Sequence, residues 1–243
     1  MHNLIQAEWT KLRTTASFFW TTGITLVISA LYGLLFGYAS RTSGMPYAPL
    51  TVIASVATTI AIIVIVQAAM TVTTEYRYGI PATNFRVVAQ RWQLAVAKVL
   101  LGAVLAAIVA LVALVLAFIL GDLTASVPAN WTSNPATQRA LWAVPLGMAL
   151  ITMFTQGVGW LVRNTSGTIV ACISMMLLVE TIVGFIPRFG ADVAKFLPFG
   201  NLTSFMVNQP NGHWGLGVSL LVFAVWAVGL WIAGLVALES RDA

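Results

Sequence analysis

Six long stretches of apolar residues, separated by polar segments, dominate the pattern of the chain. About 20 consecutive apolar residues are enough to cross the hydrocarbon core of a bilayer as a helix. The stretches run approximately over residues 16–38, 50–72, 99–120, 140–162, 169–186 and 214–238. Strands are not indicated, because no period-2 alternation over about ten residues recurs. The pattern predicts an all-α integral membrane protein, with six transmembrane helices in a single transmembrane domain over residues 1–243.

The composition strengthens this prediction. Of the 243 residues, 59% are hydrophobic and only 8% are charged, whereas about 25% of a typical soluble domain is charged. A water-soluble enzyme, a nucleic-acid-binding domain and a disordered chain are therefore poor interpretations. The first apolar stretch is longer than the roughly 7–15-residue core of a signal peptide. It is interpreted as an uncleaved first span.

The charged residues predict an orientation. The chain has twelve Lys and Arg against seven Asp and Glu, a net charge of +5. Short loops rich in Lys and Arg stay on the cytoplasmic side. The basic residues on one side are Lys11, Arg13, Arg77, Arg86, Arg91, Lys98, Arg163 and Arg241, and those on the other are Arg41, Arg139, Arg188 and Lys195. The first, larger group predicts that both termini are cytoplasmic.

The N-terminal residues 1–15 have the pattern of an amphipathic helix. Ile5, Trp9 and Leu12 fall on one face, and Glu8 and Lys11 are spaced as an i, i+3 pair. A helix of this kind lies in the membrane interface and leads into the first span.

A second amphipathic segment is predicted between spans two and three. The connection over residues 73–98 is long for a simple turn, and after Pro81 the apolar residues Phe85, Val88 and Trp92 recur at helical spacing. The segment is either a positively charged surface helix resting on lipid or a docking surface for a cytosolic partner.

Three residues inside the spans attract attention. Glu180 is ionisable, and an intramembrane charge costs roughly 2.5–3.5 kcal/mol on insertion scales. It could line a polar cavity, remain protonated, or bond to a hydroxyl on another span. Gly33 and Gly37 form a G-x-x-x-G motif, which lets two helices approach closely. Alone, the motif is weak support for pairing of two chains.

Catalytic and metal-binding motifs are missing from the sequence. It contains no G-x-x-x-x-G-K-[ST] phosphate loop, no H-E-x-x-H and no G-x-S-x-G. Cys172 is the single cysteine, and His2 and His213 are far apart. We therefore expect no catalytic residue and no metal site in this chain.

Several short motifs in order resemble a known family. AEWTKLR at residues 7–13, EYRYG at 75–79, AQRW at 89–92 and LVRNTSG at 161–167 are similar to segments of actinobacterial ABC-2-type transporter permeases. The resemblance extends over essentially the whole chain. Residues 78–86 depart from it, since the family more often has a Thr-rich segment there.

The resemblance implies the permease subunit of an ATP-binding cassette exporter in the bacterial plasma membrane. Such a subunit forms the translocation path and pairs with a second copy or a sister permease. It works with cytosolic ATPase subunits, which carry ATP and Mg²⁺, so this chain binds no cofactor. Its partners would thus be ATPase subunits, another permease and lipid, and not nucleic acid.

The resemblance also implies roles for the polar residues. Residues 73–92 would be a cytoplasmic coupling helix, with contacts to the ATPase from Glu75, Tyr76, Arg77, Gly79, Arg86 and Arg91. Residues 1–15 would be a connecting helix along the membrane, carrying Glu8, Trp9, Lys11 and Arg13. Spans one and five would face the other permease, which places Gly33, Gly37 and Glu180 at the interface or the translocation path.

Two alternatives remain open at the level of the sequence. An ion-coupled secondary transporter would need a midplane site and usually discontinuous helices in repeated halves, and the sequence shows no paired short broken spans. A non-transporting structural membrane subunit fits the same apolar pattern.

Overall fold

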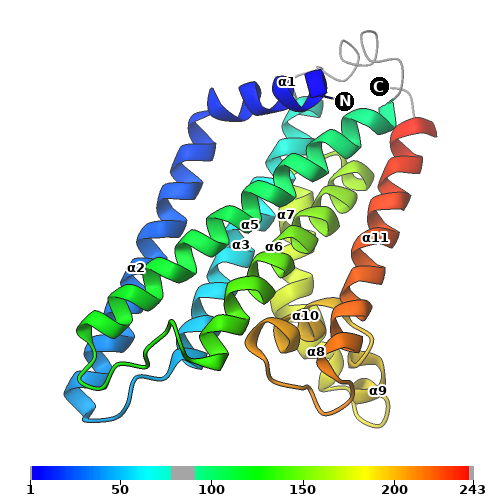
Figure 1. Cartoon of the computed structure of the whole chain (residues 1–243). Coiled ribbons are helices and arrows are strands. Elements are labelled where there is room, and N and C mark those ends of the chain that lie inside the picture. Colours follow the sequence, from blue (N-terminus) through cyan, green and yellow to red (C-terminus); the bar gives the residue numbers. More distant parts are fainter. Residues whose placement is uncertain (1, 78–90, 241–243) are drawn as a thin grey trace.

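The computed structural model describes residues 2–77 and 91–240, and within these ranges every regular element is helical (Figure 1). The long helices are α2 (Ala16–Ser43), α3 (Pro49–Arg77), α5 (Arg91–Thr124), α6 (Pro135–Val162) and α11 (Leu216–Ser240). The shorter elements are α1 (His2–Arg13), α7 (Thr165–Ser174), the π-helical η1 (Met175–Val179), α8 (Glu180–Gly184), α9 (Gly190–Ala194) and α10 (Pro198–Val207). The prediction of an all-α chain is confirmed for the described residues.

Six helical segments in the described ranges are long and apolar enough to cross a bilayer, as predicted. Most extend beyond the predicted limits, because a helix continues through flanking polar residues that a hydropathy pattern leaves out. The third span, for example, begins at Arg91 rather than near residue 99. The fifth span, Thr165–Gly184, combines α7, η1 and α8.

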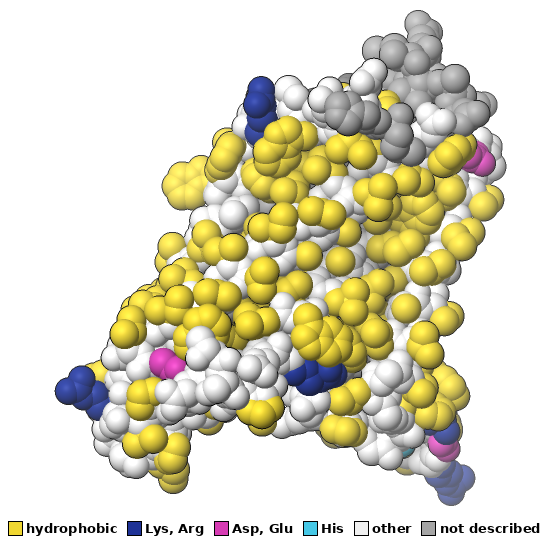
Figure 2. All heavy atoms as spheres, viewed as in Figure 1, with side chains coloured by type: hydrophobic (Ala, Val, Ile, Leu, Met, Phe, Trp, Pro, Cys, Tyr) yellow, Lys and Arg dark blue, Asp and Glu magenta, His cyan; other side chains and the backbone are white. Residues whose placement is uncertain are grey.

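The helices form a tilted bundle with two distinct ends (Figure 1). One end carries α1 and the last turns of α11, and the opposite end carries α8, α9 and α10. On the face in Figure 2, hydrophobic side chains cover the middle of the molecule, and charged side chains appear toward the two ends. This distribution matches the requirement of a bilayer for an apolar band.

Helix α6 lies at the centre of the bundle and packs against α3, α5 and α11. Its N-terminus follows the rules for a helix start: Asn134 accepts from the backbone N–H of Ala136, and Pro135 occupies the first turn. Met148, Ile151 and Trp160 on α6 are buried in the core. The large apolar side chains of the outer spans are instead exposed, as is expected of surfaces that face lipid.

The predicted coupling helix over residues 73–92 has different limits in the structure. Residues 73–77 are the last five residues of α3, and Arg91 and Trp92 are the first two residues of α5. Residues 78–90, which include Gly79 and Arg86, lie outside the described residues. The prediction was wrong about both ends of this segment, because the long membrane helices continue past the apolar core.

Helices α2 and α5 converge at the end opposite α1 and diverge toward α1 (Figure 1). They converge through glycines: a Cβ on Gly33 would clash with the backbone of Ala117, and one on Gly37 would clash with Thr124 and Gly121. Helix α1 spans the wide end of this wedge and contacts both α2 and α5.

Candidate functional site

A buried lysine joins three helices at the α1 end of the bundle. The Lys98 ammonium contacts Glu8 Oε2 at 2.6 Å and Glu75 Oε1 at 2.8 Å, and it donates to the carbonyl oxygen of Thr71 at 3.2 Å. Only 2% of its side chain is exposed. All three N–H donors of the ammonium therefore have acceptors, as a buried charge requires.

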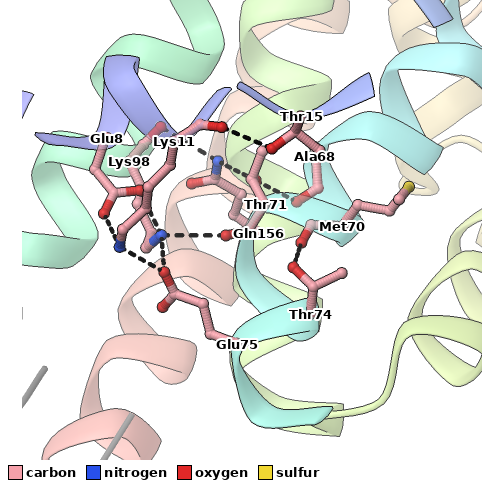
Figure 3. A network of polar contacts seen from close by, with 10 residues as sticks. All are labelled: Glu8, Lys11, Thr15, Ala68, Met70, Thr71, Thr74, Glu75, Lys98 and Gln156. Carbon is pink, nitrogen blue, oxygen red and sulfur yellow. Dashed lines mark hydrogen bonds and ion pairs between the residues drawn. The ribbon is translucent and has the colours of Figure 1, made fainter. Parts of the chain in front are cut away.

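Lys11 completes this ion cluster, which we define as Glu8, Lys11, Glu75 and Lys98 (Figure 3). Its ammonium lies 2.8 Å from Glu8 Oε1 and 3.0 Å from Glu75 Oε1. Unlike Lys98, it is about half exposed, with 46% of the side chain accessible. The cluster thus has a buried cation on the inside and a half-exposed cation on the outside, with two carboxylates between them.

The neighbouring charges keep the α1 members of the cluster ionised. Burial alone would raise the pKa of Glu8, but the ammonium groups of Lys98 and Lys11 outweigh it and lower that pKa below its ordinary value. Burial would likewise lower the pKa of Lys11, and the carboxylates of Glu8 and Glu75 raise it instead. Both groups are therefore charged at neutral pH.

The sequence brings the cluster together from distant positions. Glu8 and Lys11 are one turn apart on α1, Thr71 and Glu75 are one turn apart near the end of α3, and Lys98 is in the second turn of α5. The two helices that flank residues 78–90 are thereby tied to each other and to α1. Removing one partner of a buried ion pair costs about 3–5 kcal/mol, so these three elements should move as one unit.

A cavity of about 460 Å³ lies beside the cluster, between α1, α2, α3 and α5. Its lining is mostly apolar, with hydroxyl, amide and charged groups at intervals. The residues that line it are Glu8, Lys11, Leu12, Thr15, Ser17, Phe18, Thr21, Gln67, Met70, Thr71, Thr74, Glu75, Lys98, Leu101 and Gly102. In the part of the chain that the structure describes, no group of three or more His, Cys, Asp or Glu could hold a metal ion.

The structure changes the roles suggested for Glu8 and Glu75. Both carboxylates face the interior and pair with lysines of the same chain, so they do not present a surface to another protein. The exposed side chains on α1 are different ones. Trp9 is 40% exposed and its ring meets Phe18 edge-on, and Arg13 is exposed.

Tyr76 and Arg91 are also engaged within the chain. The ring of Tyr76 packs edge-on against Trp160 with centroids 6.1 Å apart, and the guanidinium of Arg163 lies 5.1 Å from the centre of the tyrosine ring. Arg91 donates to the carbonyl oxygen of Leu238 at 3.0 Å. These contacts fasten the end of α3 to α6 and the start of α5 to α11. The side chain of Arg77 lies outside the described part.

The G-x-x-x-G motif of the first span has an intrachain partner. Gly33 and Gly37 are buried on α2 and lie against the backbone of α5. The close helix approach that the motif suggested is present, but it occurs within one chain. That face of α2 is already occupied.

Glu180 bonds to backbone N–H groups rather than to a hydroxyl of another span. Its two carboxylate oxygens accept from Phe199 N at 2.6 Å and from Gly200 N at 2.5 Å. These N–H groups belong to the first turn of α10, where the helix dipole favours a negative charge. Glu180 therefore fixes the short helix α10 to the fifth span.

Sequence reasoning missed Lys98 as a site residue and counted it only as a positive charge near the membrane. A signal was available, because Lys98 follows Ala95-Val96-Ala97 and precedes Val99-Leu100-Leu101. A lysine surrounded by apolar residues needs a buried anion or access to water. Nothing in the sequence identified Glu8, which is 90 residues away, as that anion.

A known protein family matches most of the chain. The profile of the ABC-2 family transporter protein matches residues 4–186, which include the whole ion cluster and the first five spans. The chain belongs to the ABC-2 transporter family. No match was found among curated protein sequences. Members of this family are membrane subunits of transporters, and the chain is accordingly an ABC-2-type permease and a multi-pass membrane protein.

Proposed function

We propose that this permease belongs to an exporter driven by separate cytosolic ATPase subunits and that it pairs with a second copy or a sister permease. Membership of the ABC-2 family supports the proposal. The absence of a phosphate-binding loop from the sequence is consistent with it, because ATP and Mg²⁺ would then be held by the partner.

The proposed location is the plasma membrane of a bacterium, with the α1 end of the bundle in the cytoplasm. The larger group of basic residues supports this orientation. Lys11 and Arg13 on α1 belong to that group, and so do Arg91 and Lys98 at the start of α5.

The observation that supports coupling best is the ion cluster. Residues 78–90 would contact the ATPase, with Arg77, Gly79 and Arg86 as the proposed contacts, and Trp9 and Arg13 would extend that surface along α1. The cluster ties α1 to both helices that flank residues 78–90. A displacement of this segment on ATP binding would then reach α1, α3 and α5 together. Such a rigid transfer is what an alternating-access step requires.

The second permease would contact the fifth span. Helices α7, η1 and α8 form the least buried of the six candidate spans in the described residues, and their exposed apolar side chains include Val170, Leu178 and Ile182. An apolar face of this kind suits either lipid or another apolar helix. Cross-linking between cysteines placed at Leu178 of two copies would separate these possibilities.

The coupling proposal is tested by charge reversal at Arg86. Reversal at Glu75 would be ambiguous, because it would also break the buried cluster. The Arg86→Glu variant should lose co-purification with the ATPase and stimulation of ATP hydrolysis in nanodiscs. Arg41→Glu is the matched control, because Arg41 is an exposed arginine in the last turn of α2, at the opposite end of the bundle.

Unchanged association of Arg86→Glu with the ATPase would refute the assigned contact. Flux in vesicles that follows a proton gradient without any ATPase would refute the exporter proposal as a whole. A chain that binds the ATPase but supports no flux with any cargo would indicate a structural subunit.

A further inference from the structure

The cavity beside the ion cluster has the dimensions and lining of a ligand site. Its volume of about 460 Å³ is within the range of roughly 300–1,000 Å³ that small-molecule sites occupy. Leu12, Phe18, Met70 and Leu101 supply apolar walls on four different helices. An apolar part of a ligand therefore has a place against these four side chains.

Four threonine hydroxyl groups in the polar walls of the cavity can serve as acceptors. The hydroxyl groups of Thr15, Thr21 and Thr74 donate to backbone carbonyls of their own segments, at Lys11, Ser17 and Met70. Thr71 does the same toward Ala68. Because these hydrogens are already used, the oxygens can act toward a ligand only as acceptors. Thr21 Oγ1 already accepts from Gln67 Nε2 and Thr71 Oγ1 from Gln156 Nε2, which leaves each of them one lone pair.

Glu75 adds a charged acceptor. Its Oε1 receives both Lys11 and Lys98, whereas its Oε2 receives no hydrogen bond from the residues that the structure describes. The two carboxylates of the cluster balance the two ammonium groups. The cluster therefore does not repel a cation as an isolated lysine would, and Glu75 Oε2 is available to one.

Gln156 supplies an independent sign of a missing donor. Its side chain is fully buried and lines a small space of about 20 Å³ that shares Leu12, Phe18, Thr71 and two further wall residues with the main cavity. The amide nitrogen donates to Thr71 Oγ1 and to the Lys98 carbonyl, each at 3.3 Å. The amide oxygen is buried without a partner within the described chain. A buried acceptor left in this state costs about 1–3 kcal/mol.

We propose that the cavity binds an amphiphile whose polar end is a primary amine. The ammonium donates to Glu75 Oε2, to Gln156 Oε1 in the adjoining small space and to one threonine oxygen, and the apolar body lies against Leu12, Phe18 and Met70. Two sources supply this chemistry: a phospholipid with an ethanolamine headgroup and a free alkylamine. Binding requires no ATPase, so it is measured independently of the proposed export function.

The first experiment compares two zwitterionic lipids whose headgroups differ by methylation of the amine, together with an anionic lipid. The protein is placed in nanodiscs of equal parts phosphatidylethanolamine, phosphatidylcholine and phosphatidylglycerol, and retained lipids are counted by native mass spectrometry. The trimethylated choline headgroup keeps the positive charge but has no N–H. Loss of a hydrogen bond to a charged group corresponds to about a tenfold or larger change in affinity, and phosphatidylethanolamine should be enriched by that factor.

The second experiment uses dodecylamine and dodecyltrimethylammonium in nanodiscs that contain phosphatidylcholine alone. Dodecylamine should bind at least about tenfold more tightly than its trimethylated form. If dodecylamine, added to the mixed nanodiscs of the first experiment, also displaces enriched phosphatidylethanolamine, the lipid is the occupant. If dodecylamine binds selectively and no lipid is enriched, the occupant is a free amine.

Two variants locate the binding. Glu75→Gln removes the charged acceptor, and Gln156→Met removes the buried one and keeps the size of the side chain, so the second variant remains informative if the first does not fold. Each should weaken dodecylamine binding by about tenfold. Gln138→Met is the control, because Gln138 is exposed at the far end of the bundle.

Equal retention of the ethanolamine and choline lipids, together with equal binding of the two alkyl cations, would overturn the proposal. A preference for phosphatidylglycerol would overturn it too, because the site would then select an anion through Lys11. Folded variants that bind dodecylamine as tightly as the unaltered protein would show that the cavity is not the binding site.

Discussion

Replacing Lys98 by Met should release α1 from the bundle. Methionine keeps the length of the side chain and favours helix, so α5 itself is preserved. The change removes the ammonium that contacts Glu8 at 2.6 Å and Glu75 at 2.8 Å. Two buried carboxylates then share Lys11 alone. Breaking a buried ion pair in this way costs about 3–5 kcal/mol.

Two further contacts of α1 are each weaker than this loss. The pair of Lys11 with Glu75 is half-exposed, and pairs of that kind contribute about 0–1 kcal/mol. The edge-on contact of Trp9 with Phe18, at 6.4 Å between centroids, adds about 0.5–1.5 kcal/mol beyond its buried area. Detachment of α1 is therefore expected to precede unfolding of the spans.

Hydrogen exchange in nanodiscs measures this detachment directly. A loss of about 3 kcal/mol increases the exchange of the α1 amides by roughly 100-fold. Lys11→Met is the matched control and should change the exchange less than about tenfold, because its pairs are solvent-screened. The double variant Lys98→Met/Glu8→Met removes the orphaned carboxylate with the lysine, and it should recover much of the protection.

Equal exchange of α1 in the two single lysine variants would refute the reasoning, because it would mean that burial does not distinguish the two ammonium groups. Unchanged protection in Lys98→Met would show that α1 is held by its apolar face alone.

Three further predictions concern other contacts. Glu8 has a lowered pKa in the folded chain, so its ionised form stabilises the docking of α1 above pH 4.5, and this contribution is lost as the pH falls through the lower pKa of the folded state. Lys11 has a raised pKa, so its protonated form stabilises the docking below pH 10.5, and that contribution is lost as the pH rises through the higher pKa of the folded state. Protection factors of α1 should thus be flat between these limits and decrease outside them. Glu180→Gln removes one of two acceptors from the α10 N-terminus and should cost about 1–2 kcal/mol, measured as faster exchange over residues 198–207. Gly33→Ala forces α2 away from α5 and should lower the Tm, whereas Gly23→Ala, which meets no atom within 4 Å, should raise stability by about 0.5–1 kcal/mol. The pair is compared by thermal unfolding in the same lipid.

The sequence predicted the six spans but not which residues and helices contact one another, for a physical reason. An apolar run must form a helix in lipid wherever it occurs, so the six spans follow from local composition. The partners of Lys98, Glu180 and Gly33 depend on tertiary packing, which one sequence does not encode locally. The sequence correctly indicated a close helix approach at Gly33, but the partner is α5 of the same chain.

The limits of the third span show the same distinction. Hydropathy detects the apolar part of α5, whereas the helix itself begins earlier, at Arg91, whose side chain bonds to the end of α11. Lys98 was consequently placed at the membrane boundary. In the folded chain it is a buried member of the ion cluster.

The close glycine contact between α2 and α5 lies near one end of α2, so a change of the angle between the two helices would displace mainly the other end. If α2 pivots about the contact at Gly37, Ala16 at the other end of the helix is about 30 Å from the pivot, at 1.5 Å per residue. A rotation of about 10° around Gly37 would displace the α1 end of α2 by roughly 5 Å, about the pitch of one helical turn. Because α2 is this long, a small change of its angle near one surface of the membrane produces a large displacement of the helix end near the other surface. A bulkier residue at Gly37 would change the position of the other end of α2, which carries the cavity residues Ser17, Phe18 and Thr21.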